Sequence, residues 1–86
     1  MSTPVPALVI SRIDALCSGW CDRRCLTALR HLLPAWPVTS PLTDGWGELR
    51  IALQNVRALA RSEITASELV EVEQLIRDVN NIIEHR

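Results

Sequence analysis

The apolar residues of this chain recur at intervals of three and four along four separate stretches. The clearest stretch holds Leu69, Val72, Ile76, Val79 and Ile83. At about 100° per residue, such a series lies on one face of an α-helix. No stretch alternates apolar and polar residues, with β-branched side chains, over the length of a strand. The sequence therefore predicts an all-α fold.

Caps and breakers set the expected bounds of the helices. We expect Gly19 to end or bend the first helix and Pro34 to stop the second. Thr65 and Glu68 have the spacing of a capping box, which predicts the start of the last helix. Residues 34–42 hold three prolines and should form an extended connector. The four helices are expected at roughly residues 4–18, 21–33, 44–61 and 65–85.

These elements predict one domain, residues 1–86, built as a compact antiparallel bundle of three to four helices. The third and fourth helices should form a hairpin. The first helix begins near two prolines, and Gly19 separates it from the second. If it packs poorly, part of the hairpin's apolar stripe stays open. A two-fold homodimer is the commonest way to cover such a stripe.

Charge and composition exclude several classes of protein. The net charge is −1 and the isoelectric point is near 6.1, whereas a dedicated nucleic-acid-binding domain is usually strongly basic. We therefore do not expect nucleic acid to be a partner. All nine basic residues are arginine, which is typical of a GC-rich bacterial genome. Neither a signal peptide nor a stretch of ~20 apolar residues is visible, so we expect a cytoplasmic protein that makes no membrane contact.

Cys17, Cys21 and Cys25 form a C-x3-C-x3-C pattern that could hold a metal ion or sense thiol oxidation. No second pair of cysteines completes a zinc site. We expect all three thiols to be buried as small hydrophobic groups, with neither metal nor cofactor bound. Cys25 and His31 lie about 120° apart around one predicted helix, so they should not form a catalytic pair.

Two groups of residues are candidates for binding a protein partner. Trp36 and Trp46 bracket the connector, and one indole could remain exposed as an anchor. The alternative is that both indoles cap the core. Arginines at spacings of seven and four form a basic ridge on the third predicted helix, unless they pair with Glu73 or Glu84. The ridge consists of Arg50, Arg57 and Arg61.

The leading hypothesis is a small bacterial-type protein-interaction or regulatory module that acts through apolar helix surface. Ile51, Ala58 and Val70 lie off the main apolar stripes and are expected to supply that surface. The partner could be a second copy or another protein, and the sequence identifies no small-molecule ligand. The chain shows no convergent catalytic set, so we do not expect an enzyme. A thiol or metal sensor that uses the cysteine triplet is the alternative, and a nucleic-acid-associated factor that uses the arginine ridge is a weaker one.

Overall fold

The computed structural model describes residues 6–36 and 43–84 and contains four α-helices and one short 3-10 turn within them. No strand occurs in these two ranges, which agrees with the predicted all-α class. Residues 4–5, 37–42 and 85, which belong to predicted helices or to the connector, lie outside the described ranges. The elements are α1 (Pro6–Arg23), α2 (Leu26–Leu32), the 3-10 turn η1 (Leu33–Ala35), α3 (Thr43–Leu59) and α4 (Ala66–Glu84).

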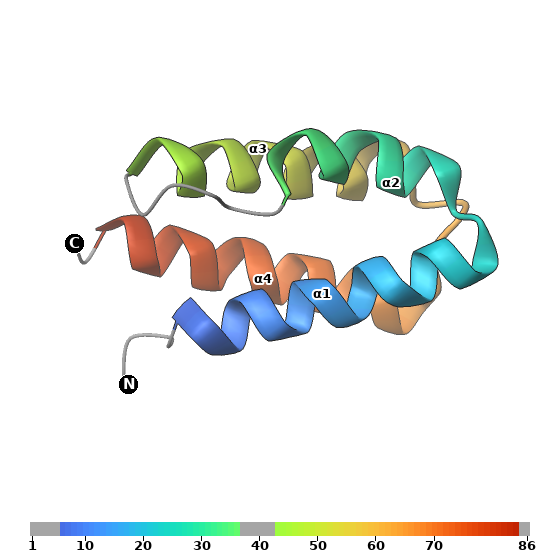
Figure 1. The fold of residues 1–86 in the computed structure, drawn as a ribbon, viewed down its shortest axis with the longest axis horizontal. Helices are drawn as coiled ribbons and strands as arrows, with labels where there is room; N and C mark the ends of the chain where they lie inside the picture. Colours follow the sequence, from blue (N-terminus) through green and yellow to red (C-terminus); the bar gives the residue numbers. More distant parts are fainter. Residues whose placement is uncertain (1–5, 37–42, 85–86) are drawn as a thin grey trace.

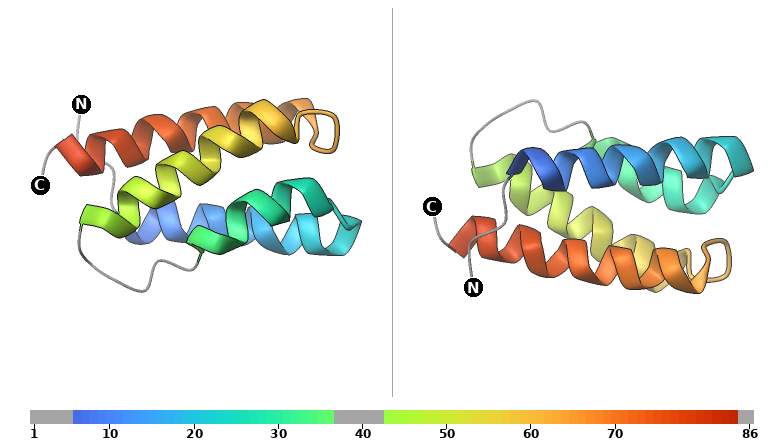
Figure 2. Two further views of the ribbon diagram at one scale, coloured as in Figure 1. Left: turned by 90° about the horizontal axis from the view of Figure 1, so that it is seen from above. Right: turned by 90° about the horizontal axis from the view of Figure 1, so that it is seen from below.

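The four helices form a ring in which successive helices run in opposite directions (Figure 1). α2 packs against α1 and α3, and α4 packs against α3 and returns to α1. The views from above and from below, each perpendicular to that of Figure 1, show the same order around the ring (Figure 2). The predicted antiparallel bundle is therefore confirmed, including the hairpin formed by the last two helices.

All four helices contribute to one hydrophobic core. The first helix packs fully, because its Val9, Ile13 and Trp20 side chains are completely buried. The open stripe that would follow from a loosely packed first helix is therefore not found. Among the described residues, no polar or charged residue is buried. The largest fully buried side chains are Trp20, Ile13, Leu32, Leu49, Leu53, Leu75, Val9, Val56, Val72 and Val79.

The prediction that Gly19 ends the first helix is wrong, because α1 continues through it to Arg23. The helix ends at Arg24, which adopts a left-handed conformation with φ of 57°. The Cys25 N–H donates to the Trp20 carbonyl at 2.9 Å, and the Arg24 N–H donates to the Cys21 carbonyl at 3.3 Å. This is the Schellman pattern, in which glycine is the usual left-handed residue.

α2 begins at Leu26, five residues later than expected, and no side chain of its own caps it. The cap comes from Glu63, in the turn between α3 and α4. Its Oε1 accepts a hydrogen bond from the Thr27 N–H at 2.8 Å and a longer one from Ala28 at 3.3 Å. Two of the free N–H groups of the first turn of α2 are thus satisfied from another part of the chain.

α4 begins with the predicted capping box. The Thr65 N–H donates to Glu68 Oε1 at 3.0 Å, and the Glu68 N–H donates to Thr65 Oγ1 at 3.1 Å. Glu68 also forms an ion pair with Arg23 near the end of α1. The cap of the last helix is therefore joined to the first helix.

Candidate functional site

The three cysteines do not converge on one site. Cys17 and Cys25 are buried, whereas Cys21 is exposed, so the expectation that all three are buried is wrong for Cys21. Cys21 lies on α1 and Cys25 beyond its end, because the helix break falls after Cys21 rather than before it. Within residues 6–36 and 43–84, no group of three or more His, Cys, Asp or Glu side chains could hold a metal ion.

The surroundings of the buried thiols make them poor nucleophiles. Burial is the largest cause that raises the pKa of Cys17 to about 11, and the neighbouring Cys21 and Asp14 contribute to the same shift. Cys17 is therefore almost entirely protonated at neutral pH, and the thiolate is the reactive form. Cys25 Sγ donates to the Glu63 carbonyl at 3.4 Å. Both residues act as small core groups.

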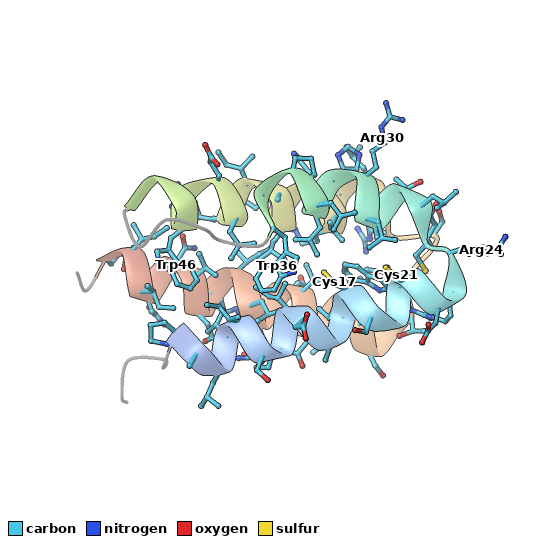
Figure 3. The ribbon with its side chains drawn as sticks, in the orientation of Figure 1. Cys17, Cys21, Arg24, Arg30, Trp36 and Trp46 are labelled. Carbon is cyan, nitrogen blue, oxygen red and sulfur yellow. The ribbon has the colours of Figure 1, made fainter. Side chains whose placement is uncertain are left out.

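The tryptophans serve the core rather than an exposed anchor. Trp46 is only 7% exposed, and Trp36 is half-buried against the core cluster. Both indoles lie between the helices rather than pointing away from the bundle (Figure 3). The interpretation of the two residues as core caps is the one that fits.

The arginine ridge does not form one continuous surface on α3. Arg50 is half-buried and donates to Asn80 Oδ1 of α4 at 3.1 Å. Arg57 is exposed on the last turn of α3, and Arg61 lies beyond the end of that helix. No ion pair joins any of the three to an acid in the part of the chain that the structure describes.

The acidic residues of α4 pair instead with α1. Arg12 bridges two carboxylates of α4, donating through Nη1 to Asp78 at 2.6 Å and through Nε to Glu71 at 2.9 Å. Arg23, at the end of α1, forms an ion pair with Glu68 of α4. These contacts join acidic side chains of α4 to arginines of α1, and they do not involve α3.

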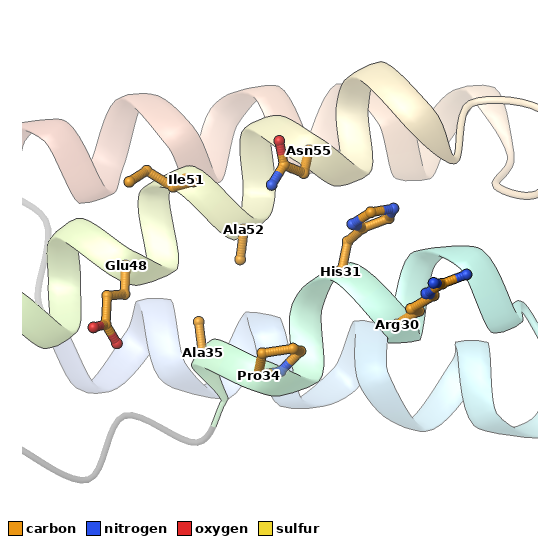
Figure 4. Close-up of a pocket in the computed structure, with 8 residues that line it drawn as sticks. All are labelled: Arg30, His31, Pro34, Ala35, Glu48, Ile51, Ala52 and Asn55. Atoms are coloured by element: carbon orange, nitrogen blue, oxygen red, sulfur yellow. The ribbon is translucent and has the colours of Figure 1, made fainter.

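An open groove of about 430 Å³ lies between α2–η1 and α3. We call it the α2–α3 groove. Pro34 ends α2, and the small side chains of Ala35 and Ala52 leave the space between the two elements unfilled. Ile51 of α3 stands at the groove with 54% of its surface exposed. The groove is lined by Arg30, His31, Pro34, Ala35, Glu48, Ile51, Ala52 and Asn55 (Figure 4).

Charge is distributed unequally along the α2–α3 groove. Arg30 and His31 lie at one end of the close-up, and Glu48 lies at the other (Figure 4). The apolar residues, including Ile51, lie between them. Arg30 and Glu48 are exposed, and neither takes part in an ion pair with another described residue. The groove therefore has a mainly apolar centre, which also includes Asn55, with a cationic and an anionic end.

Exposed large apolar residues occur on all four helices and on η1, and of these only Ile51 lines the groove. The large hydrophobic side chains that remain exposed are Leu8, Ile10, Leu26, Leu33, Ile51, Leu59 and Val70. Four of these seven lie on α2, η1 or α3, the elements that border the groove. The predicted exposure of Ile51, Ala58 and Val70 is confirmed.

Comparisons with protein-family models, with curated proteins and with solved structures find no match to this chain. In the ranges the structure describes, no helix has the length and apolar character needed to cross a membrane. The assignment of a site therefore depends on geometry and chemistry alone.

Sequence reasoning identified only one residue of the groove, Ile51, because it falls off the apolar stripe of its helix. Arg30, His31 and Glu48 carried no comparable signal. Their proximity depends on how α2 and α3 pack, and no spacing along the chain encodes that packing. Pro34 was the one other residue of the groove with a signal in the sequence, because it marks the end of α2 beside α3.

Proposed function

We propose that this domain is a small bacterial-type protein-interaction or regulatory module that binds a partner protein through the α2–α3 groove. The observation that carries the proposal is the position of Ile51, a large apolar side chain 54% exposed beside a hollow. An apolar centre surrounded by charged groups is the usual anatomy of a protein interface. The α2–α3 groove has both the apolar centre and the charged groups around it.

The shape of the groove favours a protein over a small molecule. Its volume of about 430 Å³ lies within the range of ligand pockets, but it is closer to a flat surface than to an enclosed cavity. Small-molecule sites usually bury most of their ligand. An open groove instead accepts a few side chains that project from a larger surface.

The chemistry of the groove favours binding over reaction. Its lining residues include no serine, threonine, cysteine or lysine, so none of these nucleophiles is available there. His31 and Glu48 lie toward different ends of the groove (Figure 4). We therefore propose a non-enzymatic role.

The sensor alternative finds less support in the geometry. Cys17 and Cys25 are buried and Cys21 is exposed, so the triplet offers a single accessible thiol. The nucleic-acid alternative is also weakened, because Arg50 is occupied by Asn80 and the ridge is interrupted at the end of α3. Neither observation supports a second proposal.

Site-specific photo-crosslinking in the organism that encodes the chain tests the proposal. A crosslinking amino acid replaces Ile51 in one strain and Val70 of α4 in another. Val70 is the matched control, because it is 57% exposed but lies away from the groove lining. Each crosslinked protein is identified by mass spectrometry, and its binding to the purified domain is then measured.

We expect one defined protein to crosslink from position 51 and not from position 70. The reconstituted complex should weaken by about tenfold or more with Ile51→Glu and remain unchanged with Val70→Glu. Equal crosslinking from both positions, or a complex indifferent to Ile51→Glu, would contradict the proposal.

A further inference from the structure

We infer that the partner seated in the α2–α3 groove is the same groove of a second copy of this chain. The inference rests on the proposed function, since it names the partner of that site. Its basis is the distribution of charge described above, with Arg30 at one end, Glu48 at the other and Ile51 between them. A patch with this order is complementary to itself.

Self-complementarity follows from the two-fold operation. A two-fold axis through the centre of the groove reverses its direction, so each residue i meets residue j of the other copy and j meets i. Glu48 of each copy then faces Arg30 of the other. Two identical ion pairs form at opposite ends of one interface, and no like charges are brought together.

The apolar residues of the centre meet across the same axis. Ile51 lies toward the Glu48 end of the groove (Figure 4), so the axis places it over the middle and the Arg30 end of the other copy's groove. Pro34, Ala35 and Ala52 provide the hollow around it. Desolvation of Ile51, Pro34 and Ala35 supplies the affinity, whereas exposed ion pairs contribute little to it and chiefly fix register.

Arg30 and Glu48 are available for such pairing. Both side chains are exposed, and neither is in an ion pair with another residue of the described ranges. The other exposed apolar residue used as a reference, Val70, is not part of the groove. The inference therefore assigns the interface to one face of the bundle and leaves the outer surface of α4 free.

Sedimentation equilibrium over a hundredfold concentration range tests the inference on the full chain. A monomer has a mass of 9.6 kDa, and the expected result is a transition to twice that mass. Ile51→Glu should raise the dimer Kd by about tenfold or more. Val70→Glu should leave the Kd unchanged, and circular dichroism confirms that each variant keeps its helices.

Exchange of the two charges tests the register. Glu48→Arg and Arg30→Glu should each raise the dimer Kd by roughly tenfold, because each places like charges opposite one another at both ends. The variant that carries both substitutions restores the opposition and should return the Kd to within about threefold of the original. Failure of the double variant to recover affinity would overturn the two-fold pairing.

Two other outcomes would also overturn the inference. One is a mass of 9.6 kDa at every concentration. The other is a dimer that Ile51→Glu does not weaken. The crosslinking experiment then separates the two proposals, because a different protein captured at position 51 preserves the proposed function while it removes the second copy as the partner.

Discussion

The Glu63 carboxylate caps the start of α2 by accepting a hydrogen bond from the backbone N–H of Thr27, 36 residues away in the chain. Hydrogen bonding with Thr27 lowers the pKa of Glu63 most strongly; burial opposes this, and the Ala28 backbone N–H adds to the lowering. One side chain in the α3–α4 turn therefore holds a helix that forms one wall of the groove.

Removal of the Glu63 carboxylate should loosen the start of α2. Glu63→Ala should lower the thermal midpoint and speed amide hydrogen exchange at Thr27 and Ala28, because both N–H groups lose their acceptor. Glu63→Gln retains an acceptor oxygen and should have a smaller effect. Ser62→Ala, in the same turn, is the control. Unchanged exchange at Thr27 in Glu63→Ala would show that the cap contributes nothing in solution.

Acid should destabilise the protein through Glu63 and Glu68. Burial raises the pKa of Glu68, but hydrogen bonds from Arg23 and Thr65 and the positive charge of Arg23 outweigh it, and the net shift is downward from 4.5. A carboxylate with a lowered pKa in the folded state stabilises the fold above its unfolded pKa, and the stability is lost as pH falls through the folded value. Urea unfolding from neutral pH to about pH 3 should show a decreasing free energy of unfolding below pH 4.5.

The Glu68→Gln variant serves as the control for that titration. It should be less stable than the original at neutral pH and should lose less stability on acidification, since one of the two titrating groups is gone. Parallel curves for the two proteins would mean that Glu68 does not contribute to the acid response.

Gly19→Ala should stabilise the protein by about 0.5–1 kcal/mol, because glycine in a helix interior loses more backbone entropy on folding than alanine does. A Cβ at Gly19 would meet no heavy atom within 4 Å, so the added methyl group causes no clash. A thermal melt should show a rise of several degrees, at about 4–8 °C per kcal/mol. A fall in the midpoint would mean that α1 does bend at this position.

Arg24→Gly should also stabilise the protein, by up to about 1 kcal/mol. Arg24 adopts φ of 57°, a region that favours glycine over residues with a Cβ. Its neighbour supplies the matched control, since Arg23 is helical and paired with Glu68. Arg23→Gly should destabilise the protein in the same urea or thermal unfolding experiment. Two changes of the same sign would argue against the helix end seen at Arg24.

Thiol labelling should distinguish Cys21 from the other cysteines. Cys21 is exposed and should react rapidly in the native protein, whereas Cys17, with its pKa raised to about 11, and the buried Cys25 should react only in denaturant. Cys21→Ser should abolish the rapid phase and leave the slow one. Equal rates for all three thiols would indicate that the core opens readily between α1 and α2.

The residues that sequence analysis placed correctly are those whose signal is local. The spacing of Val72, Ile76 and Val79 identifies the buried face of α4, and Thr65 with Glu68 identifies its start. These features depend only on residues that are close in sequence, so they do not change with the way the helices pack.

The features that sequence analysis missed depend on distant residues or on strain. Glycine is the usual helix terminator, and here an arginine occupies the left-handed position while Gly19 stays helical. The misplaced break also put Cys21 on the wrong face. The Glu63 cap and the α2–α3 groove arise only once helices far apart in the chain have packed together.

The contact between α1 and α4 sets the order in which this bundle can be completed during synthesis. The carboxylates that pair with Arg12 lie 59 and 66 residues after it in the chain. The carboxylate that pairs with Arg23 lies 45 residues after that arginine. The ribosome must therefore release α4 before the first helix can be covered on that side. Until then the apolar face of the nascent α1 is exposed, which makes the unfinished chain a candidate for chaperone binding.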